Sequence, residues 1–336
     1  MQLDEAYARC LALTRAHYEN FPVARLVPRR LRPAVAAVYA FARTADDFAD
    51  EGYDTSGPAN LPPAERLRLL RAFESALLAS AEGQPVPPEW DWIFTALADT
   101  RRRYNLPLTL FQDLLSAFTQ DVTVKRYATF AGVLDYCRRS ANPVGRLVLL
   151  LHGFHDAERF AQSDAICTAL QLANFWQDVG VDFKKDRIYV PQEDWPRHHV
   201  TEADFAAASA SPNLRACLEF QVERTRRLFE RGRPLPGELP FPLSLEIRLT
   251  WLGGSSILDR VEAQDCDTLR ARPATAPSTK SASSSAPSSP SNVLFLTSRG
   301  PLSLQSGLLL PLPQAGAARR HVRLLRFLPC GRRYLR

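Results

Sequence analysis

The stretch from Gln171 to Pro191, QLANFWQDVGVDFKKDRIYVP, decides how the rest of the chain is interpreted. Three polar residues in it, Asn174, Asp178 and Asp182, stand four apart, which is about 40° of rotation per step on an α-helix. They would form one polar stripe, held in one direction by the apolar residues between them. Taken alone, a stripe of this kind is more often a solvated or salt-bridged helix face than a ligand site.

A second acidic segment changes that balance. Residues 39–51, YAFARTADDFADE, place Asp46 and Asp50 at positions i and i+4, with Asp47 and Glu51 as a parallel pair. Like charges at this spacing repel each other on a helix, and no lysine lies within a turn to offset them. A solvated acidic helix end is the simple alternative, but an external cation would explain both segments. Oxygen ligands without His or Cys favour Mg²⁺, which keeps several waters and completes its shell with substrate phosphates.

Helical periodicity dominates the chain, and no segment shows the sustained alternation of a half-buried strand. The sequence therefore predicts an all-α fold with a cavity between helices. One helix begins near Pro33 and carries the first carboxylates at its C-terminal part, where the helix dipole favours cations. A helix over 130–152 is expected to kink at Asn142-Pro143. Gly253-Gly254 allows either close helix packing or a break. The other helices are expected over residues 3–18, 64–82, 90–104, 107–120, 213–231 and 243–264.

The formal net charge of +6 belongs to the end of the chain. From Thr268 onward there is no Asp or Glu, whereas eleven of the 42 Lys and Arg residues lie there. Residues 1–267 hold 31 basic against 36 acidic groups, a net charge of about −5. Nucleic-acid binding loses its main support, because the expected folded part is mildly acidic.

Residues 273–336 form a low-complexity basic tail that differs from an expected helical domain over residues 1–272. The run at 271–292, ARPATAPSTKSASSSAPSSPSN, is almost entirely Ala, Pro, Ser and Thr. Such a composition cannot bury enough apolar surface to offset the entropy of ordering. We expect the tail to be disordered, or to be the product of a shifted reading frame or a recent extension. The alternative is a basic tail that attracts the protein to anionic lipid.

The six cysteines are scattered, without a C-x-x-C pair or a zinc-type Cys–His cluster. This usage is typical of reduced cysteines that pack in the interior of a cytoplasmic protein. Asp4 and Glu5 stand where a signal peptide would carry positive charge, and no apolar run approaches the ~18 residues of a transmembrane helix. The sequence predicts a cytoplasmic protein, at most peripheral at the inner membrane.

Together the two acidic segments resemble the motifs of the squalene and phytoene synthase family, the head-to-head isoprenoid synthases, over about residues 5–272. The family's first motif, D-x-x-x-D with an arginine three residues before it, is matched by Asp46, Asp50 and Arg43. Its second motif, N-x-x-x-D-x-x-x-D, is matched by the stripe, with Gln171 before it and the run Arg187 to Pro191 after it. Two motifs in this order, about 130 residues apart, are a specific signal.

The resemblance implies a single-domain isoprenoid synthase bundle with a central cavity, a Mg²⁺ cofactor and a prenyl diphosphate substrate. The implied metal ligands are Asp46, Asp50, Asn174, Asp178 and Asp182. The implied diphosphate-binding residues are Arg43, Arg187 and Arg248, whereas Arg138 and Arg139 are expected to face either diphosphate or solvent. The implied catalytic residues are Tyr39, Tyr136, Gln171, Gln177 and Tyr189. Phe41, Phe175 and Trp176 are further aromatic candidates for stabilising a carbocation, although each aromatic taken singly is more often core.

Departures from the common family pattern indicate one branch. Gln177 replaces the usual arginine before the middle aspartate, residues 141–145 read ANPVG, and Asp186 stands where glycine is frequent. With FARTADD, NFWQD and TWLGG, these variants look like the bacterial hydroxysqualene synthases of hopanoid biosynthesis. The implied reaction is ionisation of presqualene diphosphate, rearrangement of the cation and capture by water, a carbon–oxygen lyase activity on a prenyltransferase-like fold. Gln177 or Asn142 would position the water.

Two other functions stay open at this point. The first is a transferase of the same family that condenses two prenyl diphosphates to presqualene diphosphate or phytoene. The second is an inactive helical binding protein. The expected partners are the prenyl diphosphate substrate, the membrane surface in transient association, and other squalene-pathway enzymes that receive the product, with no nucleic acid.

Overall fold

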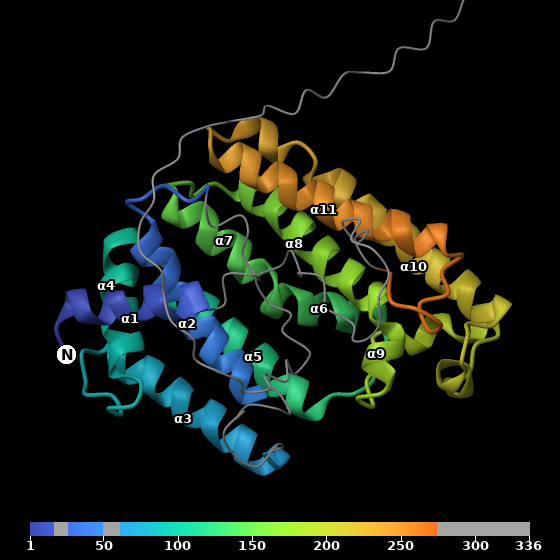
Figure 1. Ribbon diagram of the computed structural model, residues 1–336, viewed down its shortest axis with the longest axis horizontal. Coiled ribbons are helices and arrows are strands. Elements are labelled where there is room, and N and C mark those ends of the chain that lie inside the picture. Colours follow the sequence, from blue (N-terminus) through green and yellow to red (C-terminus); the bar gives the residue numbers. More distant parts are fainter. Residues whose placement is uncertain (17–25, 50–60, 274–336) are drawn as a thin grey trace, which may run out of the picture. The chain divides into compact units, whose positions relative to one another are not determined.

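The computed structural model describes residues 1–16, 26–49 and 61–273, and these residues form an all-α structure (Figure 1). The expected fold class is therefore confirmed. Apart from an isolated bridge between Arg126 and Ile188, the described residues contain no β-structure. The α-helices are α1 (Leu3–Ala16), α2 (Arg32–Ala49), α3 (Pro63–Ala81), α4 (Asp91–Tyr104), α5 (Leu108–Thr123), α6 (Phe130–Ser140), α7 (Asn142–Leu151), α8 (Ala157–Gln177), α9 (Val179–Phe183), α10 (Pro212–Gly232) and α11 (Leu243–Ala263).

Short 3₁₀ helices connect the later elements: η3 (Gln192–Asp194), η4 (Pro196–His198), η5 (Glu202–Ala206) and η6 (Leu235–Glu238). Asp50, Glu51 and residues 274–336 lie outside the described residues. The domain boundary at residue 272 and the nature of the tail therefore stay predictions.

The helix boundaries follow local sequence chemistry. Thr129 caps α6 by accepting a hydrogen bond from Gly132 N at 3.1 Å, and Asp156 caps α8 in the same way. Pro143 lies in the first turn of α7, where its missing N–H costs nothing. The expected kink at Asn142-Pro143 is therefore a full break, since α6 ends at Ser140 and α7 begins two residues later.

Two apolar cores hold the helices together. The first lies among α2, α3, α4 and α5, where Phe41 packs on Phe73 with ring centroids 5.2 Å apart and on Phe111 at 5.3 Å. The second is built around α8 and includes Trp176, whose Nε1 donates to Thr225 Oγ1 on α10 at 2.8 Å. Phe41 and Trp176 are thus core residues, the ordinary role of an aromatic side chain.

Helix α8 runs between α7 and α11 (Figure 1), and glycines allow its neighbours to approach closely. Gly145 on α7, Gly232 on α10 and Gly254 on α11 each leave no room for a Cβ. At Gly232 that Cβ would lie 2.9 Å from the carbonyl oxygen of Gln162, and at Gly254 it would lie 2.2 Å from Leu170 Cδ2. Gly253-Gly254 is therefore a close-packing site within a continuous α11. Because α7, α10 and α11 pack closely against it, α8 holds the residues of the second motif in a fixed orientation.

The described cysteines are free and four of them are buried: Cys10, Cys137, Cys217 and Cys266. Burial raises the pKa of the Cys10 thiol to about 12, which keeps it protonated and unreactive at neutral pH. This is the packing role expected from the sequence. Within the described residues, none of the helices combines the length and apolarity needed to span a membrane.

Candidate active site

The second acidic motif lies at the junction of α8 and α9. Helix α8 ends at Gln177, and Asp178, with φ −105° and ψ 12°, separates it from α9. The stripe nevertheless keeps its four-residue hydrogen bonds, because Asp178 N donates to Asn174 O at 3.0 Å and Asp182 N donates to Asp178 O at 2.7 Å. Asp178 and Asp182 are buried and Asn174 is half-buried. The single helix expected here is thus interrupted, but its polar residues still follow one another turn by turn.

A guanidinium from the end of the described chain binds this motif. Arg272 forms a two-pronged contact with Asp178, in which Nε binds Oδ1 and Nη2 lies 3.3 Å from Oδ2. The same Nη2 donates to Gln177 Oε1 at 3.3 Å, and Gln177 Nε2 donates to Pro273 O at 2.6 Å. Gln177 stands where the family usually has arginine, so Arg272 brings a guanidinium to the same neighbourhood from a distant segment. Gln177 holds that arginine in place.

The first acidic motif lies at the end of α2. Arg43 pairs with Asp47, and its Nη1 lies 3.9 Å from Asp46 Oδ2. Burial alone would lower the pKa of Arg43, but the two carboxylates raise it above its usual value. The repulsion expected among the acidic residues is therefore partly offset by an arginine of the same helix. Burial also raises the pKa of Tyr39, one turn before Arg43, to about 12.

Three of the aromatic residues expected to stabilise a carbocation come together. Phe175 on α8 and Tyr189 stack in parallel, with ring centroids 3.7 Å apart and 5° between the planes. Tyr136 on α6 lies 6.0 Å from Phe175 and 6.2 Å from Tyr189. Tyr127, which sequence reasoning did not single out, also stacks on Tyr189, with ring centroids 5.6 Å apart. We call these four residues the aromatic cluster; all are buried.

Asp121 was also missed from the sequence. It lies near the C-terminal end of α5 and is only 8% exposed. Its Oδ2 accepts a hydrogen bond from the Tyr136 hydroxyl at 2.8 Å, and its carbonyl oxygen accepts one from Arg187 Nη2 at 3.2 Å. An isolated aspartate in an amphipathic helix gives no sequence signal for such contacts, because both partners are distant in the chain.

The remaining predicted residues are placed differently. Arg187 and Gln171 are buried, and Gln171 lies one turn before Asn174 on α8. Arg248 lies on α11, and its side chain is exposed. Asn142 is engaged within the fold, since its Oδ1 accepts from Thr168 Oγ1 at 2.9 Å. Asp186 has φ 57°, in the left-handed region that favours glycine.

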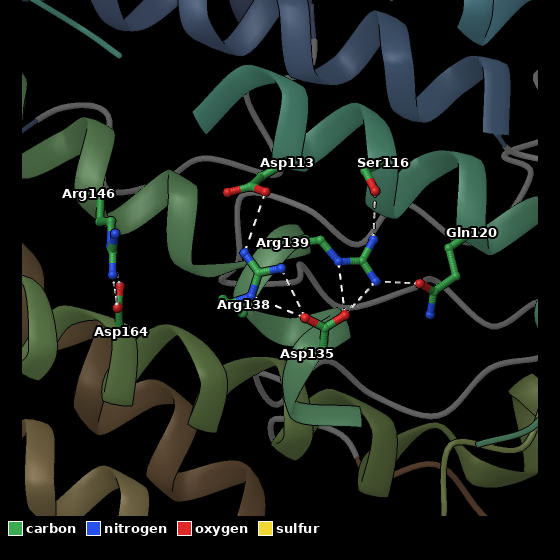
Figure 2. A network of polar contacts seen from close by, with 8 residues as sticks. All are labelled: Asp113, Ser116, Gln120, Asp135, Arg138, Arg139, Arg146 and Asp164. Atoms are coloured by element: carbon green, nitrogen blue, oxygen red, sulfur yellow. Dashed lines mark hydrogen bonds and ion pairs between the residues drawn. The ribbon is translucent and has the colours of Figure 1, made fainter. Parts of the chain in front are cut away.

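The arginine pair on α6, Arg138 and Arg139, contacts residues of both α5 and α6. Figure 2 shows Arg139 between the two helices, with Nη1 donating to Ser116 Oγ on α5 at 2.8 Å and Nη2 to Asp135 Oδ2 at 2.9 Å. Arg138 binds the same Asp135 and lies 3.5 Å from Asp113 on α5. These contacts fasten α6 to α5. Arg138 is exposed, as a solvated arginine would be, whereas Arg139 is largely covered by its contacts with α5, an arrangement that the sequence did not predict.

The donor set of the two motifs fits a hard divalent cation in its chemistry. It consists of carboxylate and amide oxygens, and the ion pair of Asp178 with Arg272 shows that this buried carboxylate attracts a cation. Among the described residues no three His, Cys, Asp or Glu side chains converge as a metal cage. One or two carboxylates from each motif, with waters and substrate phosphates, is instead the arrangement that Mg²⁺ commonly adopts.

Comparison with known proteins shows which family the chain is similar to. The sequence model of squalene/phytoene synthases matches residues 13–279. The chain belongs to the squalene/phytoene synthase family. A hydroxysqualene synthase of Rhodopseudomonas palustris is 35% identical over 250 residues, which cover 74% of this chain and 80% of that protein. A 15-cis-phytoene synthase of Synechococcus elongatus is 29% identical over 287 residues, which cover 80% of this chain and 88% of that protein.

The fold agrees with the family as well. The crystal structure of the squalene synthase HpnC from Alicyclobacillus acidocaldarius aligns with a TM-score of 0.70 and 39% identity, covering 78% of this chain and 95% of that one. As a member of the squalene/phytoene synthase family, the chain has an isoprenoid synthase fold. The similar proteins include both hydroxysqualene and phytoene synthases.

Proposed function

We propose that the chain is a hydroxysqualene synthase, which ionises presqualene diphosphate, lets the cyclopropylcarbinyl cation rearrange and captures it with water to release hydroxysqualene and diphosphate. The observation that carries this proposal is the position of the aromatic cluster beside the second motif. Phe175 belongs to the cluster and is one residue from Asn174 on α8. Groups suited to a carbocation and groups suited to a metal-bound diphosphate thus share one helix end.

Magnesium would be held by Asp46 and Asp50 of the first motif and by Asn174, Asp178 and Asp182 of the second. When bound, it would neutralise the charge that develops on the leaving diphosphate. Arg43 and Arg187 would bind phosphate oxygens by charge-assisted hydrogen bonds. Arg248 stays a third candidate for this role, on an exposed face of α11.

The chain's own residues would then guide the cation. The π faces of Tyr136 and Tyr189 attract positive charge, each by ~0.5–2 kcal/mol in a desolvated site. Burial of the cluster excludes bulk water, so that the cation rearranges before it is quenched. Tyr39, Gln171 and Gln177 are the remaining catalytic candidates, with Gln177 orienting either the quenching water or Arg272. Conversion of Gln177→Leu should shift the products from alcohol towards hydrocarbons.

The test is incubation of the purified chain and Mg²⁺ with presqualene diphosphate, and separately with farnesyl and geranylgeranyl diphosphates. We expect hydroxysqualene from presqualene diphosphate alone, and ¹⁸O in the alcohol when the reaction runs in H₂¹⁸O. An Asp178→Ala variant should be inactive, whereas Asp265→Ala, an exposed control, should keep full activity. Condensation of two prenyl diphosphates, or an alcohol oxygen that is not from solvent, would refute the proposal.

A condensing synthase is the second candidate function. It is supported by the 29% identity to the phytoene synthase of Synechococcus elongatus over 80% of this chain. In that case farnesyl or geranylgeranyl diphosphate would be consumed in the same assay, and the product would be presqualene diphosphate or phytoene. Absence of both conversion and substrate binding would instead indicate an inactive binding protein.

For location and partners, we propose a cytoplasmic enzyme that associates transiently with the membrane surface and passes its product to other squalene-pathway enzymes. The product is an apolar lipid, and large apolar side chains are exposed in and just before α11: Phe241, Leu245, Leu249 and Leu252. Sedimentation with anionic phospholipid vesicles tests this, and a Leu249→Ser, Leu252→Ser double variant should bind more weakly. Equal binding of the variant would contradict a role for this face.

A further inference from the structure

Asp121 joins two parts of the candidate site that come from different segments. Its carboxylate accepts the Tyr136 hydroxyl hydrogen bond at 2.8 Å, and both side chains are buried. Its carbonyl oxygen accepts the Arg187 guanidinium hydrogen bond at 3.2 Å. One residue of α5 therefore contacts both the aromatic cluster, through its side chain, and the candidate diphosphate-binding arginine, through its backbone.

The residue next to Asp121 makes a parallel contact. Gln120 Nε2 donates to the Tyr127 hydroxyl at 3.1 Å, and Gln120 is itself held by Arg139 from α6 (Figure 2). Burial raises the pKa of Tyr127, so that this phenol stays neutral. The end of α5 thus fixes two tyrosines of the aromatic cluster, but only Tyr136 is bound to a carboxylate.

That difference has an electrostatic consequence. A hydrogen bond that a phenol donates to a carboxylate is charge-assisted, and it is stronger than one that a phenol oxygen accepts from a neutral amide N–H. In a site of low dielectric constant it also polarises the donor. The Tyr136 ring consequently gains electron density, which strengthens its attraction for a positive charge lying over its face.

We propose that Asp121 is a positioning residue of this site: its carboxylate fixes and polarises the Tyr136 ring against Phe175 and Tyr189 so that the ring stabilises the cation. The backbone contact with Arg187 sets the distance between this ring and the diphosphate. The inference rests on the proposed ionisation of a prenyl diphosphate. It does not depend on whether the cation is finally captured by water.

The first test compares Asp121→Asn, which keeps the size of the side chain and removes its charge, with Tyr136→Phe and with the double variant. Asp121→Asn should lower kcat by ~10- to 100-fold, the loss expected for one charge-assisted hydrogen bond, with KM changing little. The double variant should be no slower than Tyr136→Phe, because Asp121 acts through the tyrosine. Asp113→Asn, a control at a half-buried aspartate of the same helix, should leave kcat unchanged.

A second test is independent of turnover. A prenyl ammonium analogue carrying a diphosphate mimics the cation, and its uncharged carbon isostere does not. Asp121→Asn should weaken binding of the ammonium analogue by about tenfold and leave the isostere unaffected, since the lost interaction is with charge. Equal weakening of the two would show a merely structural role and overturn the proposal, as would additive losses in the double variant.

The two proposals can fail separately. If the wild type condenses prenyl diphosphates instead of hydroxylating, the hydroxysqualene synthase proposal fails, and the same comparison of variants is made with the condensing substrates. If the wild type forms hydroxysqualene but Asp121→Asn is as fast as Asp113→Asn, the positioning role fails and the proposed function stands.

Discussion

Arg272 places a positive charge on Asp178 from 94 residues further along the chain. Its Nε and Nη2 bind the two carboxylate oxygens, and Gln177 accepts a further hydrogen bond from Nη2 at 3.3 Å. Asp178 is the middle carboxylate of the second motif and is nearly buried. The Arg272 guanidinium thus binds a carboxylate that is also a proposed magnesium ligand. The guanidinium and a bound Mg²⁺ would therefore repel each other at Asp178.

Replacing Arg272 should change metal affinity in the absence of substrate. In Arg272→Gln the guanidinium charge no longer repels a divalent cation, so Mn²⁺, used as a spectroscopic substitute for Mg²⁺, should bind about tenfold more tightly. Arg272→Lys keeps the charge and should bind Mn²⁺ as the wild type does. Electron paramagnetic resonance titration measures free Mn²⁺ directly. Unchanged or weaker binding by Arg272→Gln would show that Arg272 and the metal do not share this carboxylate.

The segment that carries Arg272 is anchored by Asp267. This buried carboxylate accepts hydrogen bonds from Ala210 N at 2.8 Å, from Arg270 N at 3.2 Å and from Arg215 Nη2 at 3.1 Å. Asp267→Ala should therefore cost ~2–4 kcal/mol of unfolding free energy in urea denaturation. Asp265→Asn is the control, because Asp265 pairs with the same Arg215 but is 80% exposed, and asparagine tolerates its φ of 57°.

The control should lose no more than ~1 kcal/mol, as is usual for an exposed ion pair. Asp267→Ala should also loosen Arg272 and so reproduce part of the tightening of Mn²⁺ binding. Equal losses of unfolding free energy in the two variants would mean that burial does not strengthen the contribution of Asp267's hydrogen bonds to stability.

The sequence predicts the helices because their information is local. Apolar spacing places α3, α4 and α5 within a few residues of their ends, and Pro143 marks the break between α6 and α7. Motif spacing likewise identifies Asp46 and the stripe that contains Asp178. Each of these features can be recognised from neighbouring residues alone.

Contacts between distant residues are not encoded in this way. The pairing of Asp178 with Arg272 depends on how the chain returns to α8, and the contact of Asp121 with Tyr136 depends on the crossing of α5 and α6. The spacing of residues in the sequence also does not show which partner a given side chain will bind. The ion pairs of Arg43 with Asp46 and Asp47 of its own helix follow from rotamers that the sequence does not specify, and its binding of diphosphate stays a prediction.

Close packing of α10 on α8 makes a further prediction. A Cβ at Gly232 would lie 2.3 Å from Ile166 Cγ1 and 2.9 Å from a backbone oxygen, which cannot move aside as a side chain can. Gly232→Ala should destabilise the protein by ~1–3 kcal/mol despite the better helix propensity of alanine. Gly237→Ala is the control, because no atom lies within 4 Å of its added Cβ. Thermal unfolding of the two variants gives the comparison, and a stabilised Gly232→Ala would mean that α10 can shift without cost.

Glu246 on α11 is a buried carboxyl whose Oε2 has no hydrogen-bond partner among the described residues. Burial raises its pKa from the ordinary value of 4.5 to about 7. The folded state therefore holds the proton more tightly than the unfolded state. The resulting stability is fully present below pH 4.5, and it is lost as the pH rises to about 7.

Glu246→Gln removes this titration, so the variant should gain stability relative to wild type between pH 5 and pH 8, by on the order of 2 kcal/mol. Urea denaturation across this range measures the difference between the two proteins, which cancels the titration of all other groups. Glu219→Gln, at an exposed glutamate, should give a profile parallel to wild type. A parallel profile for Glu246→Gln as well would show that Glu246 is ionised at the same pH in the folded and unfolded chains.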